Sequence, residues 1–355
     1  EVETPDFACL NWETDGARLQ IGDTSVDLTP APYGTGGSTT APIRVVRTPA
    51  ELGRSDLGDC IVVLDGDLAS EPLTPKNYPF YGSAEHAEIV SALEDAGPAA
   101  VIGVTGKHAP LCGAIEPFPL IEDGDFDIPA AMVHLTDAEP VLGADGRVAT
   151  ITISSERITS QARNVVAHLG ATPAQISLWA HIDTKPDTPG AIDNGASVVA
   201  LLTLAELLGD RPLNNGIELV VVNGEDHFAA PGEQHWLGTN GDRFDEIALM
   251  VNLDAIGCLR GATTYSLYNV DQVSTDRVHE TLAKHPDIVE GPAWFQSDHA
   301  IFAARGRPAL AFTSERFDEM LETLIHSTED TPSQVDLDRV VGAAIALADL
   351  ARAWA

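Results

Sequence analysis

The stretch "LWAHIDTKPDTPGAIDNGAS", residues 178–197, joins the end of an apolar strand to a glycine-containing turn and the start of a helix. The strand ends in His181 and Asp183, whose two-residue spacing places both side chains on one face of the strand. A second carboxylate, Asp193, lies in the turn. An isolated His-x-Asp is usually a strand end that reaches solvent, so its meaning depends on the polar residues elsewhere in the chain.

Apolar strands and longer helices alternate through the chain after about residue 147. "ISLWAHID", "GIELVVVNGED" and "IALMVNLDAIG" are strand-like, whereas "GASVVALLTLAELLGD" and "LDRVVGAAIALADLARAWA" carry apolar residues at helical spacing. Strands rich in Val, Ile and Leu that alternate with helices indicate a mostly parallel sheet with helices on both faces. We therefore predict an α/β fold whose catalytic domain covers residues 147–355.

A smaller α/β pattern precedes this region. "CIVVLDG" is strand-like, and a helix is expected over "SAEHAEIVSALEDAG", with Ser83 at its start and Gly97 at its end. The strand-like runs "AAVIGVTG" and "IPAAMVHL" follow, and the region holds no catalytic constellation. We predict an inserted domain over residues 42–146, and we assign residues 1–41 to the N-terminal part of the catalytic domain.

The charge of the chain excludes several classes of partner. Its 355 residues include 54 acids and 20 bases, which give a formal charge of −34. Such a surface repels phosphate backbones and anionic lipids, so we expect neither nucleic acid nor a membrane as partner. No apolar run approaches the roughly 20 residues of a membrane span. The cysteines form no Cys-x-x-Cys pair, which argues against a thiolate zinc site and a disulfide framework; they are Cys9, Cys60, Cys112 and Cys258.

The bases include only four lysines, which are Lys76, Lys107, Lys185 and Lys284. An acidic surface poor in lysine suits a halophilic protein, because cations in concentrated salt screen the repulsion between its charges. We therefore expect stability and activity to rise with KCl or NaCl. A melting temperature that stays flat or falls between about 0.1 and 2 M salt would contradict this prediction. We expect a soluble protein, either secreted with its leader absent from this chain or located in the cytoplasm of a salt-accumulating cell.

Polar side chains follow the strands of the second region at the points where the strands end. In open α/β sheets, ligands bind at this edge. The nitrogen and oxygen donors suit zinc, cobalt or manganese, and without thiolates they do not resemble a closed structural zinc site. Five donors are too many for one catalytic zinc ion, but they fit two ions if one carboxylate bridges them. Glu225 is not needed as a ligand and is then free to act as a base. The candidate ligands are His181, Asp193, Asp226, Asp254 and His326.

Six short motifs occur in a recognisable order: "HID", "GAIDN", "GED", "NLDAIG", "SDHAIF" and "IHSTEDT". Together they resemble the co-catalytic zinc aminopeptidases, whose relatives include glutamate carboxypeptidase, the transferrin receptor and glutaminyl cyclase. The resemblance covers residues 164–340. The unit at residues 42–146 is similar to a protease-associated domain, which many of these enzymes carry in that place.

The resemblance implies a role for each candidate residue. One zinc ion is held by His181 and Asp254, the other by Asp226 and His326, and Asp193 bridges them. It further implies that Glu225 is the general base, that Asp183 orients His181, and that a cis peptide bond follows Asp193. The implied activity is that of an aminopeptidase acting on peptides with a free amino terminus.

The chain departs from the family pattern at two positions. Most members have Glu-Glu where this chain has Glu225 and Asp226, so the second acid is shorter by one methylene. Several members have Tyr before the last His, where it stabilises the tetrahedral oxyanion. Ile325 stands at that position, so the metals or another donor must serve.

The other histidines and short motifs give weaker signals. "HETLAKH" has its histidines, His279 and His285, six residues apart, so it is no H-E-x-x-H site, and we expect both on the surface. "GTGGST" is no dinucleotide loop, and no G-x-S-x-G indicates a serine hydrolase. The histidines expected near the proposed site are His227, His235 and His299.

Three alternative functions remain open. A carboxypeptidase on the same fold would offer an arginine to the substrate carboxylate, and the candidates are Arg305, Arg307 and Arg316. A glutaminyl cyclase also uses this fold. A third alternative is a non-catalytic binding protein on a peptidase scaffold, although every ligand position holds a metal-binding residue type.

Overall fold

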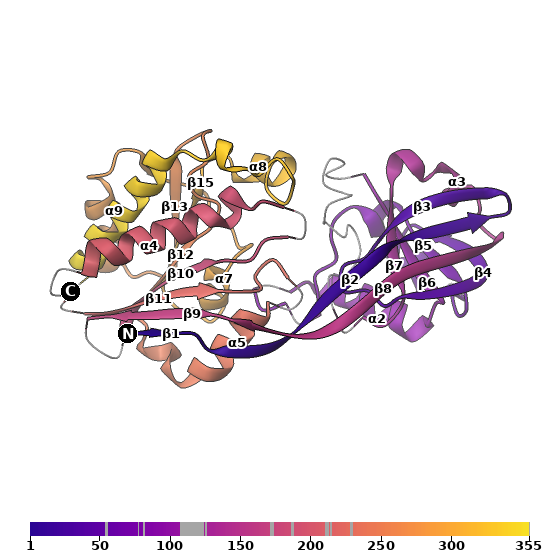
Figure 1. Ribbon diagram of the computed structural model, residues 1–355, viewed down its shortest axis with the longest axis horizontal. Helices are drawn as coiled ribbons and strands as arrows, with labels where there is room; N and C mark the ends of the chain where they lie inside the picture. The colour runs from indigo at the N-terminus through magenta and orange to yellow at the C-terminus, as the bar shows by residue number, and fades with distance from the viewer. Residues whose placement is uncertain are drawn as a thin grey trace. The chain divides into compact units, whose positions relative to one another are not determined.

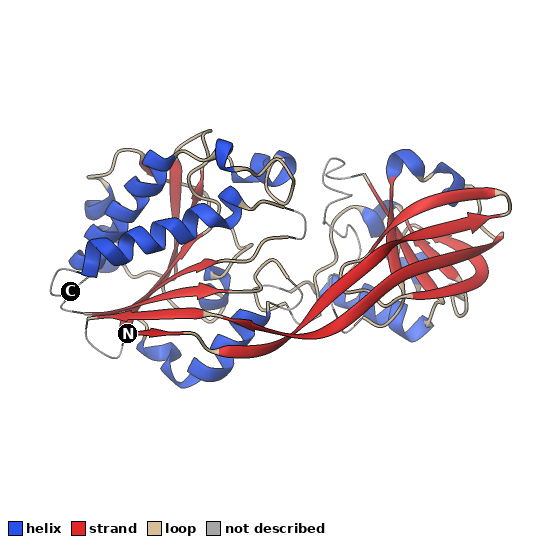
Figure 2. Cartoon of the chain, viewed as in Figure 1, coloured by secondary structure: helices blue, strands red, loops and turns tan. Residues whose placement is uncertain are grey.

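The computed structural model describes residues 1–53, 56–76, 78–80, 82–106, 124, 126–170, 174–185, 188–209, 213, 215–227 and 230–354. Cys112 and Lys107 lie outside these residues. The chain forms two compact units (Figure 1, Figure 2). The sheet unit comprises Glu1–Phe7, Pro79–Tyr81 and Ala162–Ala355, and the barrel unit comprises Ala8–Tyr78 and Gly82–Gln161.

In the described residues, the sheet unit is built on an eight-stranded sheet with the order β1-β9-β11-β10-β12-β15-β13-β14. The inner strands β11, β10, β12 and β15 are parallel, whereas β9 and β13 pair antiparallel with β11 and β15. The α/β fold predicted from the sequence is therefore confirmed. The strands are β1 Val2–Glu3, β9 Val165–Leu169, β10 Ala174–His181, β11 Gly216–Val222, β12 Leu249–Leu253, β13 Thr263–Tyr268, β14 Ile288–Glu290 and β15 Ala309–Ser314.

Helices cover both faces of this sheet (Figure 1). Successive residues of a strand point to opposite faces, so the neighbours Leu178 and Trp179 of β10 enter different layers. Leu178 lies in one apolar core with Leu204 of α4 and Leu347 of α9. The ring of Trp179 packs on the other face, against Trp236 of α5 at a centroid distance of 4.7 Å. The helices are α4 Ala196–Gly209, α5 Pro231–Asn240, α6 Gln272–Leu282, α7 His299–Ala303, α8 Phe317–Thr323 and α9 Leu337–Ala353.

The helical stretch Ala191–Gly209, which contains α4, is long and apolar enough by length and composition to cross a membrane. It contains Asp193 and Asn194, so a search for uninterrupted apolar residues misses it. Half of its most apolar window is buried, and α4 contacts α9 and β10. This is the packing of a core helix.

The barrel unit is a closed barrel with the strand order β2-β3-β7-β6-β5-β4-β8. Ser83 caps α2 by accepting a hydrogen bond from the His86 N–H, and Gly97 ends the helix at φ 60°, as the sequence predicts. The strands are β2 Asp6–Ile21, β3 Thr24–Pro30, β4 Gly37–Val46, β5 Ile61–Leu64, β6 Ala100–Thr105, β7 Ala130–His134 and β8 Val148–Arg163. The helices are α1 Pro49–Leu52, α2 Ala84–Ala96 and α3 Glu139–Leu142.

The division into units differs from the boundaries at residues 42 and 146 drawn from the sequence. β3 pairs with β2 and β7, and β4 pairs with β8, so residues 8–41 and 147–161 belong to the barrel unit. β2 and β8 are single strands of 16 residues, and each runs from one unit into the other. Because no turn or change of composition marks these crossings, the sequence pattern gives no signal there.

Candidate metal centre

The side chains predicted as metal ligands come from the ends of elements in the sheet unit. His181 is the last residue of β10, Asp226 lies in the turn after β11, and Asp254 follows β12 directly. Parallel strands end at one edge of the sheet, which brings these three residues together. Asp193 lies in the turn immediately before α4, where its backbone angles of φ −112° and ψ 87° are not helical, and His326 lies shortly after α8.

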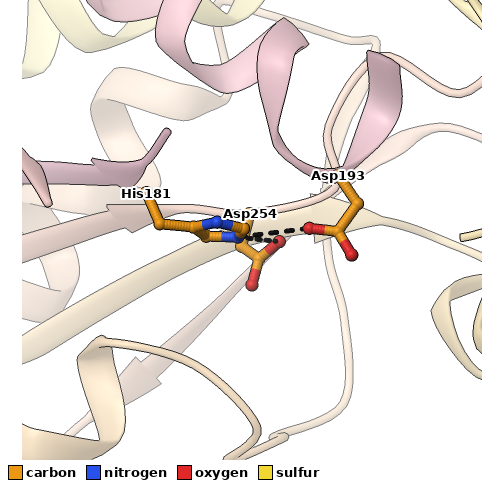
Figure 3. A group of neighbouring side chains, drawn as sticks. All are labelled: His181, Asp193 and Asp254. Atoms are coloured by element: carbon orange, nitrogen blue, oxygen red, sulfur yellow. Dashed lines mark ion pairs between the residues drawn. The ribbon is translucent and has the colours of Figure 1, made fainter. Parts of the chain in front are cut away.

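Asp193 lies between two imidazoles. Its Oδ1 is 3.1 Å from His181 Nε2, and its Oδ2 is 3.0 Å from His326 Nε2. The first imidazole is also 3.6 Å from Asp254 Oδ1, and the second is 3.2 Å from Asp226 Oδ1. Figure 3 shows the ring of His181 directed at the carboxylates of Asp193 and Asp254. In the described part of the chain, two donor groups, each close enough to hold one ion, therefore share Asp193.

Two buried atoms of this cluster, His181 Nε2 and Asp226 Oδ2, have no hydrogen-bond partner. Buried polar atoms normally have one, so these two are available to a bound ion. His181 Nδ1 lies 3.1 Å from the backbone carbonyl oxygen of Asp183, and a hydrogen bond there places the proton on Nδ1 and leaves Nε2 as a metal donor. Imidazole and carboxylate donors fit zinc, cobalt or manganese.

The carboxylate of Asp183 holds the turn that carries Glu225 and Asp226. It accepts hydrogen bonds from the backbone N–H groups of Gly224, Glu225 and Asp226, at 2.6, 3.2 and 2.9 Å. The same carboxylate is 3.8 Å from His181 Nδ1, which is too far for a hydrogen bond. Asp183 therefore contacts His181 through its backbone carbonyl, while its side chain fixes the neighbouring turn.

Asp330 fixes the turn that carries Asp193. Its carboxylate accepts hydrogen bonds from the N–H groups of Ile192, at 2.8 Å, and Asp193, at 3.1 Å. The next peptide bond, Asp193–Asn194, is cis, as the resemblance implies. The Asn194 side chain donates to the carbonyl oxygen of Leu253, at the end of β12. Asp330 stands in the "IHSTEDT" motif, but no sequence pattern predicts its contact with this turn.

The cluster carries more negative charge than its imidazoles neutralise. Burial raises the pKa of Glu225 well above the usual glutamate value; His181 opposes this rise, and Asp226 and Asp254 add to it. Burial also disfavours a charged Asp193, but the two flanking imidazoles outweigh it and lower the pKa of this residue. Burial disfavours protonation of His181, but the carboxylates of Asp193 and Asp254 raise its pKa well above the usual value. Such a site favours cations.

A second pair of acids, Glu233 of α5 and Asp298 before α7, is fully buried. None of the four carboxylate oxygens has a hydrogen-bond partner. Burial, with the charge of Asp298, raises the pKa of Glu233 well above the usual value, and burial is the main cause that raises the pKa of Asp298 to about 7. Two such carboxyls cannot both ionise without a large cost, so the pair keeps a proton near neutral pH. No sequence pattern indicates this pair.

We expect Glu233→Gln to stabilise the fold, and to do so more strongly as the pH rises. A carboxyl whose pKa is higher in the folded state than in the unfolded state loses stability as the pH rises between the two values. For Glu233, the group that the variant removes, this interval begins at 4.5 and extends well above it. After chelation of bound metal, the variant should melt with the parent near about pH 4.5 and a few degrees higher near about pH 8. An equal shift at both pH values would contradict this, and exposed Glu246→Gln is the control.

The three histidines expected near the centre separate into two kinds. His227 Nε2 lies 4.0 Å from Asp183 Oδ2, beside the cluster. His299 is fully buried, its Nε2 is 2.7 Å from a backbone carbonyl oxygen, and burial lowers its pKa to about 4. His235 lies in α5 and stacks on Phe7. His299 and His235 therefore have structural partners, and His227 is the one of the three that lies against the centre.

His279 lies in α6, and His285 lies shortly after this helix. Their Nε2 atoms pair with Glu290 at 3.5 Å and with Asp349 at 3.2 Å. The Asp349 pair brings His285 against α9, and neither histidine belongs to a donor group in the residues that the structure describes.

Ile325, where the resemblance leads one to expect tyrosine, is buried. It lies in a small apolar cluster with Met320 and Leu324 of the α8 region. An isoleucine side chain offers no hydrogen-bond donor, so this position cannot stabilise an oxyanion as a tyrosine would.

Comparison with known proteins places the chain in a family. A model of Peptidase family M28 matches residues 164–351. The "Probable lipoprotein aminopeptidase LpqL" of Mycobacterium tuberculosis is 23% identical over 285 residues, which are 77% of this chain and 53% of that protein. The chain thus spans about half the length of this curated relative.

Solved structures share the fold. The aminopeptidase from Aneurinibacillus sp. strain AM-1 has a TM-score of 0.74 and 19% identity, covering 97% of this chain and 83% of that one. BSAP, a zinc aminopeptidase from Bacillus subtilis, has a TM-score of 0.71 and 18% identity, covering 98% and 84%. The Peptidase M28 precursor from Shewanella amazonensis SB2B has a TM-score of 0.70 and 18% identity, covering 99% and 83%. With more than half of its residues matched by the family model, the chain belongs to Peptidase family M28.

Proposed function

We propose that this chain is a zinc-dependent aminopeptidase that removes N-terminal residues from peptides. The observation that supports it most is the position of Asp193, whose two carboxylate oxygens face two different imidazoles. In this proposal His181 and Asp254 hold one zinc ion, Asp226 and His326 hold the other, and Asp193 contacts both. Cobalt or manganese would suit the same donors.

When bound, a pair of zinc ions polarises a peptide carbonyl and lowers the pKa of a water molecule. Glu225 is buried beside the cluster and belongs to none of the donor groups formed by the described residues. It is therefore placed to accept the water's proton and to donate it to the departing amine. Asp183 keeps the Glu225 backbone fixed during this transfer, because it accepts the N–H groups of the turn.

The geometry gives no support to the carboxypeptidase alternative, because each candidate arginine has a structural partner. Arg305 donates to the carbonyl oxygen of Ile301. Arg307 pairs with Asp245 at 3.3 Å, and Arg316 pairs with Glu319 one helical turn away. An arginine that recognises a substrate carboxylate must keep its guanidinium directed into the site.

In this proposal the barrel unit takes no part in catalysis. We propose that it is a protease-associated domain that restricts substrate size. All the candidate donor groups found among the described residues lie in the sheet unit.

A panel of substrates tests the proposal. Amino-acid p-nitroanilides should be hydrolysed, with activity lost on chelation and restored by zinc, and the assays should be run in low and in high salt. Peptides with a blocked amino terminus should not be cleaved. Release of C-terminal residues would favour a carboxypeptidase, and conversion of an N-terminal glutamine to its cyclic form would favour a cyclase. Zinc binding without turnover of any substrate would favour a binding protein.

A further inference from the structure

One of the four lysines is buried against the candidate metal centre. Lys185 lies in the loop after β10, and its side chain is 8% exposed. Its Nζ is 3.9 Å from Asp226 Oδ1, the same oxygen that lies 3.2 Å from His326 Nε2. Among the ion pairs of the described residues, this is the one that joins a lysine or arginine to a proposed metal ligand.

The loop holds this lysine in place. The N–H and the Oγ1 of Thr188 both donate to the Lys185 carbonyl oxygen, at 3.2 and 2.5 Å. A buried ammonium group is costly unless nearby negative charge compensates it. Here Asp226 provides that charge, and the other carboxylates of the cluster add to it. A chain of charge −34 has many exposed acids, so the placement of a scarce lysine inside this cluster is specific.

The ammonium group affects the two proposed metal ions unequally. It lies against Asp226, whereas no described ion pair joins it to Asp254 of the other donor group. A positive charge repels a cation bound to the same carboxylate, and it compensates that carboxylate when the cation leaves. Both effects reduce the affinity of the Asp226 and His326 site for metal.

We propose that Lys185 is a fixed counter-cation of Asp226 that makes the Asp226 and His326 site the weaker of the two metal sites. The proposal rests on the ligand set given under the proposed function. It implies that the centre loses the ion at Asp226 first when free zinc falls, while His181 and Asp254 keep theirs.

The test is a zinc titration of the full-length protein after removal of its metal. Lys185→Met keeps the length of the side chain and removes its charge. It should tighten the weaker zinc site and change the tighter site much less; groups around metal ligands typically alter metal affinity by roughly 10- to 100-fold, and we expect a gain of that size. The readout is two-site binding in chelator-buffered zinc at constant ionic strength. A misfolded variant would lose affinity, so a gain cannot arise from damage to the fold.

Two variants serve as controls. Lys284→Met makes the same change in net charge at an exposed lysine beyond the end of α6, and it should leave both affinities unchanged. Lys185→Arg keeps the positive charge and should preserve the inequality between the sites.

The outcomes separate this proposal from the proposed function. If the parent binds two zinc ions and Lys185→Met leaves the weaker site unchanged or weakens it, the role of Lys185 is wrong while the two-metal centre stands. If neither protein binds a second zinc ion, the ligand set itself is wrong, and the proposal falls with it. One ion in the parent and two in Lys185→Met would support the proposal most strongly.

Discussion

Glu225→Gln should lower kcat by about 10²- to 10⁴-fold, the range typical of a lost general base, while the protein still binds two zinc ions. The amide keeps the size and polarity of the side chain but cannot accept a proton. The backbone should not move, because the Glu225 N–H is held by Asp183 at 3.2 Å whatever the side chain is. Steady-state kinetics on a p-nitroanilide and zinc content measured on the same sample provide the two readouts.

The neighbouring acid gives the contrast. Asp226→Asn should weaken the second metal, so added zinc should restore part of its activity, whereas zinc should not restore Glu225→Gln. Exposed Glu246→Gln makes the same chemical change away from the cluster and should behave as the parent. Near-normal turnover in Glu225→Gln, or loss of metal in Glu225→Gln but not in Asp226→Asn, would refute the assignment.

Asp193→Ala should remove both zinc ions and reduce activity by more than about 10³-fold. Its two oxygens lie 3.1 and 3.0 Å from the imidazoles of His181 and His326, so one truncation takes a ligand from each site. Loss of a shared ligand also leaves two imidazoles and two carboxylates without the group between them. Zinc content after gel filtration at fixed free zinc is the measurement.

Asp254→Ala is the matched control for this result. Asp254 is 3.6 Å from His181 Nε2, and no described ion pair joins it to His326. It should therefore cost one zinc ion and spare the other. Equal zinc content in Asp193→Ala and Asp254→Ala would show that Asp193 does not bridge two sites.

The α/β fold, and the sheet edge at which the candidate ligands meet, could be predicted because they depend on local patterns. An apolar run followed by a polar residue predicts a strand and also the edge of the sheet at which ligands bind. Examples are β10 with His181 and β12 with Asp254. The order of the motifs, through the resemblance, also implied which residues would share each metal ion. The shared position of Asp193 between two imidazoles agrees with that expectation.

The features that sequence reasoning missed depend on contacts between distant residues. The Asp330 carboxylate holds a turn 137 residues away along the chain. Glu233 and Asp298 are far apart along the chain and interact only once it has folded. In the sequence, Lys185 is an ordinary lysine in a loop. Its contact with Asp226 arises only because the fold places the turn after β11 beside that loop. None of these contacts leaves a periodic signal, because each depends on which strands are neighbours.

Asp183 bears on how far the neighbouring side chains of the centre can be exchanged. Because its carboxylate holds the three N–H groups of the turn after β11, the path of that turn does not depend on the side chains at Glu225 and Asp226. The acid at Asp226 can therefore be aspartate or the longer glutamate without rebuilding the backbone around it. A change in the length of this side chain can then alter the affinity of the proposed site for metal, whereas loss of the Asp183 carboxylate would leave three N–H groups of the turn without their acceptor at once.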